Sequence, residues 1–377
     1  MNVLSILSGY DSKNLTIGSL GGHSGLDVSH GAKQFGFKTV VVARKDRQKT
    51  YDHYYKTRGE KGCIDETIIV DQFEDILQEK NQKKLQEMNT IFVHNRYFWV
   101  YFSDFAKVEN NFEVPIFGSR HLLKLEERDQ KYNQYDLLRD ADIRTPKIFR
   151  DAQEIDRPVL VKASEAKRGY ERAFFIANNH EEWQKRGLQL EKEGAVSADW
   201  KNATIEEFVV GAPVNFNFFY SPLTGELELL GTDTRRQTNL DGFLRMTALE
   251  QQEVRKHVDL KMIETGHIAV TVKESLLEKA FDLGEKFVAA TKKIKKEIDP
   301  AQKGIIGPFA LQGAVVAENG KEDIVIFDVS LRIPGSPGTR ATPYSGYLYG
   351  ESMSGGERIG LEIKNAQEEK RLEEILT

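Results

Sequence analysis

Residues 307–332 read GPFALQGAVVAENGKEDIVIFDVSLR and predict a β-hairpin. Two apolar runs of strand length flank Asn319-Gly320, a dipeptide typical of a two-residue hairpin turn. Side chains alternate along a strand, so one face of the second strand is expected to carry Ile324, Ile326, Asp328, Ser330 and Arg332. The other face is expected to carry Val325, Phe327, Val329 and Leu331. The hairpin therefore predicts polar groups gathered toward one end of a sheet.

Gln312 interrupts the otherwise apolar partner strand of this hairpin. With Asp328 it would supply one oxygen ligand per strand, which suits Mg²⁺ shared with a polyphosphate. A polar edge strand with a surface ion pair explains the same residues, and the hairpin pattern by itself leaves both interpretations open.

Lys162 ends the apolar strand 158–161 and precedes the charged loop 165–171, EAKRGYE. A lysine at this place can reach phosphates from a sheet while the loop covers them. A strand-end lysine that extends its ammonium group to solvent is the alternative. The stretch 204–211, TIEEFVVG, suits the edge of an adenine crevice, and a plain strand after a helix explains it equally.

The length, charge and cysteine content limit the class of protein to which the chain can belong. The chain has 377 residues, enough for two or three subdomains, and its net charge of -5 gives no indication of a nucleic-acid partner. Cys63 is the single cysteine, so no intrachain disulfide can form and a reducing compartment is expected. The N-terminus lacks the features of a signal peptide, and no apolar run approaches 18 residues. These features predict a soluble, cytoplasmic protein without a membrane span.

The predicted secondary structure differs between two regions of the chain. Residues 15–43 read as strand, glycine turn, helix and strand, which is half of a nucleotide-binding α/β unit, and 90–95 and 114–119 add parallel strands. A charged helix is expected over 123–142. Beyond it, the sequence predicts an antiparallel hairpin around 157–178, a helix over 181–194, a strand over 202–211, a β-ribbon over 212–235 and a long helix over 274–298.

The order of the polar residues resembles the ATP-grasp superfamily. Lys131 is placed on a helix before Thr145-Pro146, Lys162 follows on a strand, Glu206 and Glu207 come about 45 residues later, and Gln312 and Asp328-x-Ser330-x-Arg332 complete the set. The resemblance implies an α/β plus α+β fold: a Rossmann-like preATP-grasp domain over 1–125, then an ATP-grasp domain over 126–377 with a small lid subdomain at about 146–212. It also implies ATP and Mg²⁺, with Mn²⁺ as an alternative metal.

A closer resemblance extends from end to end of the chain. The stretches that carry it are IGSLGGHSGLDVSHGAK, VENNFEVPIFGSR, IEEFVVG, FFYSPLTGELELLGTD, NLDGFLR, ESLL, GPFALQ, IFDVSLR and PYSGYLYG. They are similar to the archaeal formate-dependent ligases of purine biosynthesis that make formaminoimidazole-carboxamide ribonucleotide (FAICAR). In that family ATP phosphorylates formate, and the amine of aminoimidazole-carboxamide ribonucleotide (AICAR) attacks the formyl phosphate. The resemblance therefore implies ATP, formate and a purine-pathway ribonucleotide as partners, and a homo-oligomeric assembly.

Site roles follow from this resemblance residue by residue. The implied ATP contacts are Lys131, Lys162, Glu206, Glu207, Phe208 and Val209. The implied metal ligands are Gln312 and Asp328, and Arg332 is the implied catalytic residue. The implied ribonucleotide contacts are His23, Ser24, Tyr97, Asn239 and His267. His23 begins a helix, where N–H groups suit a 5′-phosphate, although a capping or packing histidine is an alternative.

The chain departs from the family pattern at the substrate end. Tyr97 stands in place of a serine and His267 in place of an asparagine, Asp328 is one methylene shorter than the usual glutamate, and the loop 165–171 has one glycine. Three hypotheses stay open: the formate–AICAR ligase, a paralogous ATP-grasp ligase with a different carboxylate or amine, and a non-catalytic nucleotide-binding subunit. Retention of Lys162, Gln312, Asp328 and Arg332 favours an active enzyme.

Overall fold

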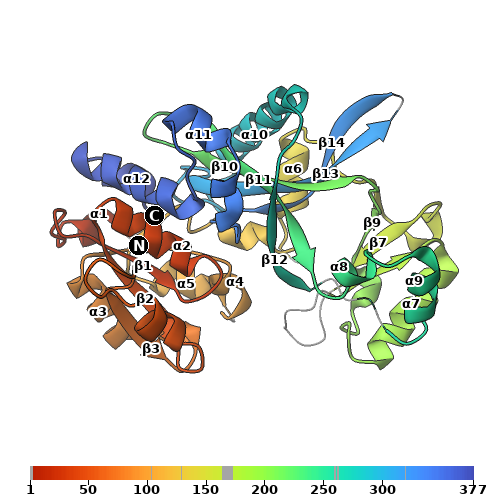
Figure 1. The fold of residues 1–377 in the computed structure, drawn as a ribbon, viewed down its shortest axis with the longest axis horizontal. Coiled ribbons are helices and arrows are strands. Elements are labelled where there is room, and N and C mark those ends of the chain that lie inside the picture. Colours follow the sequence, from red (N-terminus) through yellow and green to blue (C-terminus); the bar gives the residue numbers. More distant parts are fainter. Residues whose placement is uncertain are drawn as a thin grey trace.

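The computed structural model describes residues 3–377 except 103, 129, 164–172, 259, 261–262 and 319. Its strands form three sheets, seen in Figure 1 as a red and orange layer at lower left, a central green and blue sheet, and a yellow-green unit at lower right. Both chain ends lie beside the first sheet (Figure 1). No helix in the described part of the chain has the length and apolar character needed to cross a membrane.

The first sheet is parallel, with strand order β3-β2-β1-β4-β5. Its strands are β1 (Thr16–Leu20), β2 (Lys38–Arg44), β3 (Glu66–Val70), β4 (Thr90–Val93) and β5 (Ile116–Phe117). Its helices are α1 (Val3–Leu7), α2 (Gly25–Gln34), α3 (Glu79–Glu87), α4 (Tyr97–Val100) and α5 (Phe105–Asn111). The predicted unit of strand, glycine turn, helix and strand is confirmed, whereas β3 was not predicted. The direction in which successive strands are added to the sheet reverses between β1 and β4, so the carboxyl ends of these two strands form the topological switch point.

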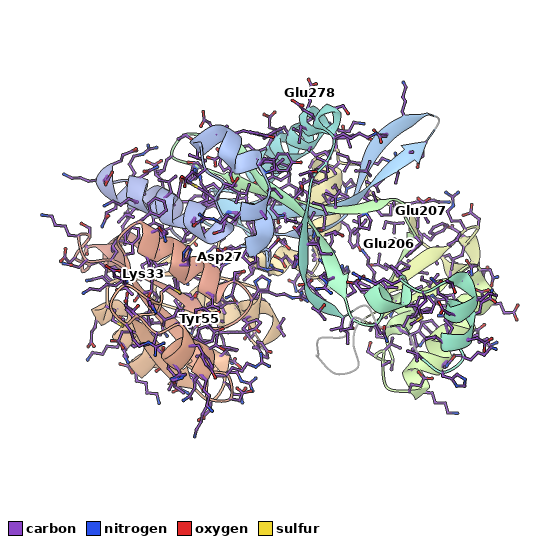
Figure 2. The ribbon with its side chains drawn as sticks, viewed as in Figure 1. Asp27, Lys33, Tyr55, Glu206, Glu207 and Glu278 are labelled. Atoms are coloured by element: carbon purple, nitrogen blue, oxygen red, sulfur yellow. The ribbon has the colours of Figure 1, made fainter. Side chains whose placement is uncertain are left out.

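The C-terminal end of the chain returns to this layer. Helix α12 (Gly355–Glu368) packs on α2, and α13 (Leu372–Ile375) follows it. The Gly356 amide donates a 2.9 Å hydrogen bond to the carboxylate of Asp27, whose position Figure 2 marks. Thr377 pairs with Ile116 through both backbone groups, at 2.9 and 3.0 Å. The α/β layer is therefore completed by residues far from it in sequence.

The second sheet is antiparallel, with strand order β12-β11-β10-β13-β14. Its strands are β10 (Ala212–Tyr220), β11 (Leu227–Gln237), β12 (Glu264–Val270), β13 (Gly307–Glu318) and β14 (Lys321–Ser330). Helices α6 (Gln134–Asp140) and α10 (Leu277–Thr291) share a core with this sheet, in which Phe218, Phe287 and Phe309 are fully buried. The predicted ribbon and terminal hairpin are confirmed, and α10 is shorter than the helix expected over 274–298. The turn residue Asn319 lies outside the described residues.

A β-bulge overturns the predicted faces of β14. Gln312 pairs with Asp328 but Gly313 pairs with Ile326, so Phe327 is an extra residue in the ladder. Such an insertion reverses the alternation of side chains from that point on. Ile324 and Ile326 therefore share one core with Val329 and Leu331, while Asp328, Ser330 and Arg332 belong to the opposite, polar face. The prediction that the two isoleucines share the face of Asp328 was wrong for this reason.

The third sheet is small and antiparallel, with strand order β6-β9-β7-β8. Its strands are β6 (Ile148–Phe149), β7 (Val159–Lys162), β8 (Phe174–Ala177) and β9 (Thr204–Glu207). Helix α7 (His180–Lys192) packs on it around Trp183 and Trp200. The predicted hairpin and helix are confirmed. The loop 165–171, expected to cover phosphates, lies outside the described residues.

The helix expected over 123–142 is not continuous. A short 3-10 turn spans Leu123–Glu126, and α6 begins only at Gln134. Asn133 caps α6, since its side chain accepts from the Tyr135 amide at 2.9 Å while Asp136 accepts from the Asn133 amide at 3.0 Å. Lys131 therefore lies in a loop rather than on a helix.

The remaining α-helices are short: α8 (Leu240–Phe243) and α11 (Tyr344–Tyr349), which contact β11, and α9 (Ala248–Val254), which follows α8. A 3-10 turn over Pro337–Ala341 packs against β11 and β12. It lies in the Gly- and Pro-rich segment after Arg332, which connects β14 to α11.

Candidate active site

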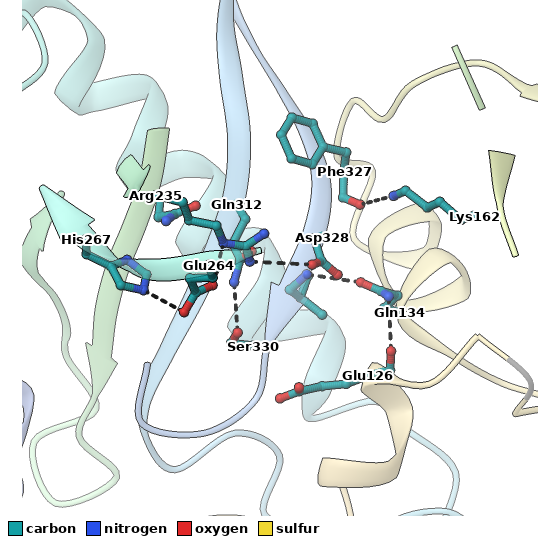
Figure 3. A network of polar contacts seen from close by, with 12 residues as sticks. Glu126, Gln134, Lys162, Arg235, Glu264, His267, Gln312, Phe327, Asp328 and Ser330 are labelled. Atoms are coloured by element: carbon teal, nitrogen blue, oxygen red, sulfur yellow. Dashed lines mark hydrogen bonds and ion pairs between the residues drawn. The ribbon is translucent and has the colours of Figure 1, made fainter. Parts of the chain in front are cut away.

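Gln312 and Asp328 lie directly opposite each other on β13 and β14. The Gln312 side chain donates a 2.9 Å hydrogen bond to Ser330 Oγ, and its amide oxygen accepts one from Arg235 of β11 (Figure 3). Arg235 also lies 3.9 Å from the Asp328 carboxylate. One amide oxygen and one carboxylate fit a divalent cation that takes its other ligands from phosphates and water. The described residues contain no group of three or more His, Cys, Asp or Glu able to hold a metal unaided.

Lys162 reaches this site from the third sheet. Its Nζ donates a 3.0 Å hydrogen bond to the carbonyl oxygen of Phe327, the bulge residue, and lies 2.6 Å from the carboxylate of Glu206. Both side chains are buried, and Tyr135 Oη donates to Glu206 at 3.1 Å. Burial lowers the pKa of Lys162 to about 8, although Glu206 opposes this shift. The lysine is thus held against the polar strand of the second sheet.

Arg128, three residues before Lys131, contacts Asp328. Its Nη2 lies 3.4 Å from Asp328, and that carboxylate raises the pKa of Arg128 although burial alone would lower it. Lys131 is exposed in the loop before α6. Gln134 fixes this region, because its buried side chain accepts from the Val329 amide at 3.0 Å (Figure 3).

The other predicted ATP contacts divide between two sides of β9. Glu206 faces Lys162, but Glu207 points the opposite way, as alternation requires, and its carboxylate accepts from Arg157 at 3.3 Å. Figure 2 marks the positions of both glutamates. Phe208 and Val209 follow β9 and are half-buried, and the Phe208 amide donates to Pro158 O at 2.9 Å. The structure thus brings Glu206, and not Glu207, to the cluster around Asp328.

His267 lies between two carboxylates. Its Nδ1 contacts Asp233, and its Nε2 lies 3.1 Å from Glu264. Burial lowers the pKa of an imidazole, but the two carboxylates raise the pKa of His267 to about 9. Glu264 in turn lies 3.2 Å from Arg235, so a continuous chain of charges joins His267 to the Gln312–Asp328 pair. Asp233 is fully buried and accepts from Asn217 at 2.6 Å.

The glycine turn after β1 carries the predicted ribonucleotide residues. His23 has a left-handed backbone (φ 52°), and its Nδ1 is 2.6 Å from Ser24 Oγ, which donates to Pro334 O at 3.0 Å. Burial, with the nearby charge of Arg332, holds the pKa of His23 well below its usual range. The Tyr97 ring packs on Gly22 so closely that a Cβ there would lie 2.0 Å from Tyr97 Cε2. His23, Ser24 and Tyr97 are thus together.

Tyr97 also lines a cavity of about 570 Å³ beside the first sheet. The cavity is bounded by the glycine turn and by a cationic segment after β2, with Gly21, Gly22, Lys45, Arg47, Lys49 and Tyr51 among its lining residues. Asn239, in contrast, is an exposed residue that begins α8 after the end of β11. Its role as a ribonucleotide contact stays a prediction.

Arg332 lies just beyond β14 and is buried. Its Nη2 lies 3.2 Å from Glu126, and its Nη1 donates to Ile333 O at 3.4 Å. Glu126 also accepts from the Leu331 amide at 2.7 Å, and burial raises the pKa of this carboxyl group. The charge of Arg332 acts on His23, His94 and Arg96, so this guanidinium links the glycine turn to the polar strand.

Several residues of this network were missed from the sequence: Glu126, Arg128, Asp233, Arg235, Glu264, His94 and Arg96. The spacing Asp233-x-Arg235 within a predicted strand places both side chains on one face and was a usable signal. Arg128 and Glu126 gave no such signal, because they lie outside any regular element that the sequence predicts correctly.

Comparison with known proteins identifies the family. One family model, described as a protein of unknown function (DUF1246), matches residues 17–149, and another, a domain of unknown function (DUF1297), matches 182–377. A Methanobrevibacter smithii protein named 5-formaminoimidazole-4-carboxamide-1-(beta)-D-ribofuranosyl 5'-monophosphate synthetase is 38% identical over 380 residues, covering 100% of this chain and 98% of that protein. The protein of that name from Methanocaldococcus jannaschii is 38% identical over 378 residues, with the same coverage.

Solved structures give the fold. An IMP biosynthesis protein PurP from Thermococcus kodakaraensis superposes with a TM-score of 0.67 at 25% identity, covering 96% of this chain and 100% of that one. An ADP complex of N5-carboxyaminoimidazole ribonucleotide synthetase has a TM-score of 0.56 at 13% identity, covering 93% and 77%, a likeness of fold alone. These neighbours are ATP-grasp proteins, as the sequence predicted. The chain therefore belongs to the family of 5-formaminoimidazole-4-carboxamide-1-(beta)-D-ribofuranosyl 5'-monophosphate synthetases, and it is an enzyme with the ATP-grasp fold.

Proposed function

We propose that the enzyme joins formate to the amine of AICAR with consumption of ATP, giving FAICAR in purine biosynthesis. The observation that carries this proposal is the polar face of β14, where Asp328, Ser330 and Arg332 follow one another beside Lys162. It combines groups for phosphates, a metal ion and an anionic substrate in one place. The full-length similarity to synthetases of this name supports the choice of substrates.

The reaction has two steps. A carboxylate oxygen of formate attacks the γ-phosphorus of ATP, the bond to the β–γ bridging oxygen breaks, and ADP leaves. The AICAR amine then attacks the carbonyl carbon of formyl phosphate, phosphate leaves, and the nitrogen loses a proton. Mg²⁺, with Mn²⁺ as an alternative, would neutralise phosphate charge when held by Gln312 and Asp328.

The protein's own residues then position the reactants. Lys162 supplies a cation from the lid side, held in place by Glu206 and the Phe327 carbonyl. Arg332 supplies a cation from the end of β14, next to the glycine turn of His23. Such fixed charges stabilise phosphoryl transfer without the cost of reorganising water. We further propose that residues 1–125 and 126–377 act as two domains, with 146–212 as the lid.

The direct test is ADP release by the purified chain with Mg-ATP. Sustained release of ADP over many turnovers should require both formate and AICAR, and ¹³C-formate should give AICAR that carries one labelled formyl group in place of an amine hydrogen. ADP release that ignores either substrate would overturn the proposal.

A second candidate, a ligase for a different amine or carboxylate, is favoured by the Tyr97 ring that fills the space over Gly22. It predicts that other carboxylates or amines stimulate ADP release more than formate and AICAR do. The two candidates are thus separated by one substrate panel.

A further inference from the structure

The charge of Arg332 acts on both His94 and Arg96 near the switch point of the first sheet, where the carboxylates are Glu126, which pairs with Arg332 at 3.2 Å, and Glu264. Both ring nitrogens of His94 are buried and have no hydrogen-bond partner within the described residues, and the same holds for Arg332 Nε. Arg96 follows the carboxyl end of β4, and burial and then Arg332 lower its pKa, whereas Glu264 and Glu126 oppose this shift. Within the described part of the chain Arg96 forms no ion pair or hydrogen bond. Buried polar groups are nearly always paired, so this cluster indicates a ligand.

The backbone holds these groups in a defined place. His94, Asn95 and Arg96 follow β4, and the glycine turn of His23 follows β1. Asn95 joins the two, because its side-chain amide donates to Leu20 O at 3.0 Å and its oxygen accepts from the Tyr97 amide at 2.9 Å. Ligands of open parallel sheets bind outside the carboxyl ends of the strands at such a switch point.

The hydrogen-bond donors of Arg332, Arg96 and His94 that have no partner in the described residues suit a small carboxylate. Both Nη groups of Arg332 are engaged, one with Glu126 and one with the carbonyl of Ile333, which leaves Nε. Arg96 keeps its whole planar fork, the geometry that binds a carboxylate through two parallel hydrogen bonds. His94 is neutral, since burial lowers its pKa to about 3, so it offers one donor and one acceptor.

We propose that Arg96, His94 and Arg332 form the binding site of the carboxylate substrate, with Arg96 as its bidentate anchor. This inference rests on the proposed function and names residues for it. Arg332 follows Asp328 and Ser330 on the polar face of β14, so a carboxylate on Arg332 lies beside the phosphate-binding groups, where it must be to attack a γ-phosphorus. The ribonucleotide phosphate is the less suitable occupant, because the Tyr97 ring covers Gly22 in the glycine turn.

The test compares Arg96→Ala and Arg96→Lys with Arg58→Ala as the matched control. Arg58 is an exposed arginine of the same domain that donates to Tyr54 O at 3.4 Å. For Arg96→Ala, the KM for formate should rise about 30-fold or more while the KM values for Mg-ATP and AICAR change less than about twofold. Arg96→Lys keeps the charge but loses the fork, so its KM for formate should fall between those of wild type and Arg96→Ala. Arg58→Ala should match wild type.

Binding of sodium formate, followed by saturation-transfer NMR on the full chain, separates this inference from the proposed function. Formate binding that Arg96→Ala abolishes upholds the site even if wild type shows no formate-dependent turnover, in which case the proposed function alone fails. If turnover depends on formate but Arg96→Ala leaves the KM for formate unchanged, the proposed carboxylate site is wrong, whereas the proposed ligase function is upheld. An increase confined to the KM for AICAR would assign Arg96 to the ribonucleotide and would also overturn it. Melting temperatures of Arg96→Ala and Arg96→Lys check that both variants are folded.

Discussion

The Nζ atom of Lys162 lies 3.0 Å from the carbonyl oxygen of Phe327, a residue 165 positions further along the chain. Phe327 is the extra residue of a bulge and so is not paired in its ladder, which leaves its carbonyl available to the lysine. The same bulge turns Asp328 to the polar face. One backbone irregularity therefore both receives the lid-side lysine and places the implied metal ligand.

Asp328→Asn should lower kcat on the order of 100-fold or more, because an amide is a weaker metal ligand than a carboxylate. Folding should be preserved, since Asp328 lies at the polar face rather than in the core. Asp323→Asn is the matched control on the same strand, where Asp323 pairs with Arg144 and Lys279. ADP release measures both variants, and near wild-type activity of Asp328→Asn would remove Asp328 from the metal site.

Glu206→Gln should destabilise the protein by roughly 3 kcal/mol, because it leaves the buried Lys162 ammonium group without its carboxylate partner. The neighbouring Glu207→Gln should cost less than about 1 kcal/mol, since Glu207 pairs with Arg157 near the surface. Urea denaturation gives both free energies of unfolding. Equal losses for the two variants would show that the Lys162–Glu206 pair has no special role in stability.

The pH dependence of stability should contain a contribution from His267. Its folded pKa, about 9, exceeds the usual value near 6.5, so protonation favours the folded state. The contribution is complete below about pH 6.5, is lost as pH rises toward 9, and amounts to roughly 3 kcal/mol at most. His267→Asn should lose this dependence. Parallel stability curves for wild type and variant between pH 6 and 9.5 would contradict the assignment.

Gly31→Ala should destabilise the fold by several kcal/mol. A Cβ at Gly31 would lie 2.1 Å from the backbone of Gly356, and two packed helices cannot separate locally without losing their contact. Gly242→Ala is the control, because nothing lies within 4 Å of a Cβ there and the residue is helical. Thermal unfolding reports both, and an unchanged melting temperature for Gly31→Ala would mean that α12 does not depend on this contact.

The sequence by itself determined the elements whose signals are local. Hydrophobic runs and turn residues predicted β1, α2, β2 and the terminal hairpin. These signals are readable because each depends on alternation, helical period or turn chemistry within about ten residues. The ATP-grasp fold and the family followed instead from a resemblance, carried by the order of Lys162, Gln312 and Asp328 and by stretches spread along the whole chain.

Only the tertiary structure decided which side chains meet. The bulge at Phe327 has no marker in the sequence, yet it sets the face of Asp328. Helix α6 begins only after its capping residue Asn133, so Lys131 lies in a loop, and the nearby Arg128 contacts Asp328. The charge of Arg332, just after β14, acts on His94 and Arg96, just after β4, although these strands lie more than 200 residues apart. Contacts of that range depend on how the sheets pack, which no local pattern encodes.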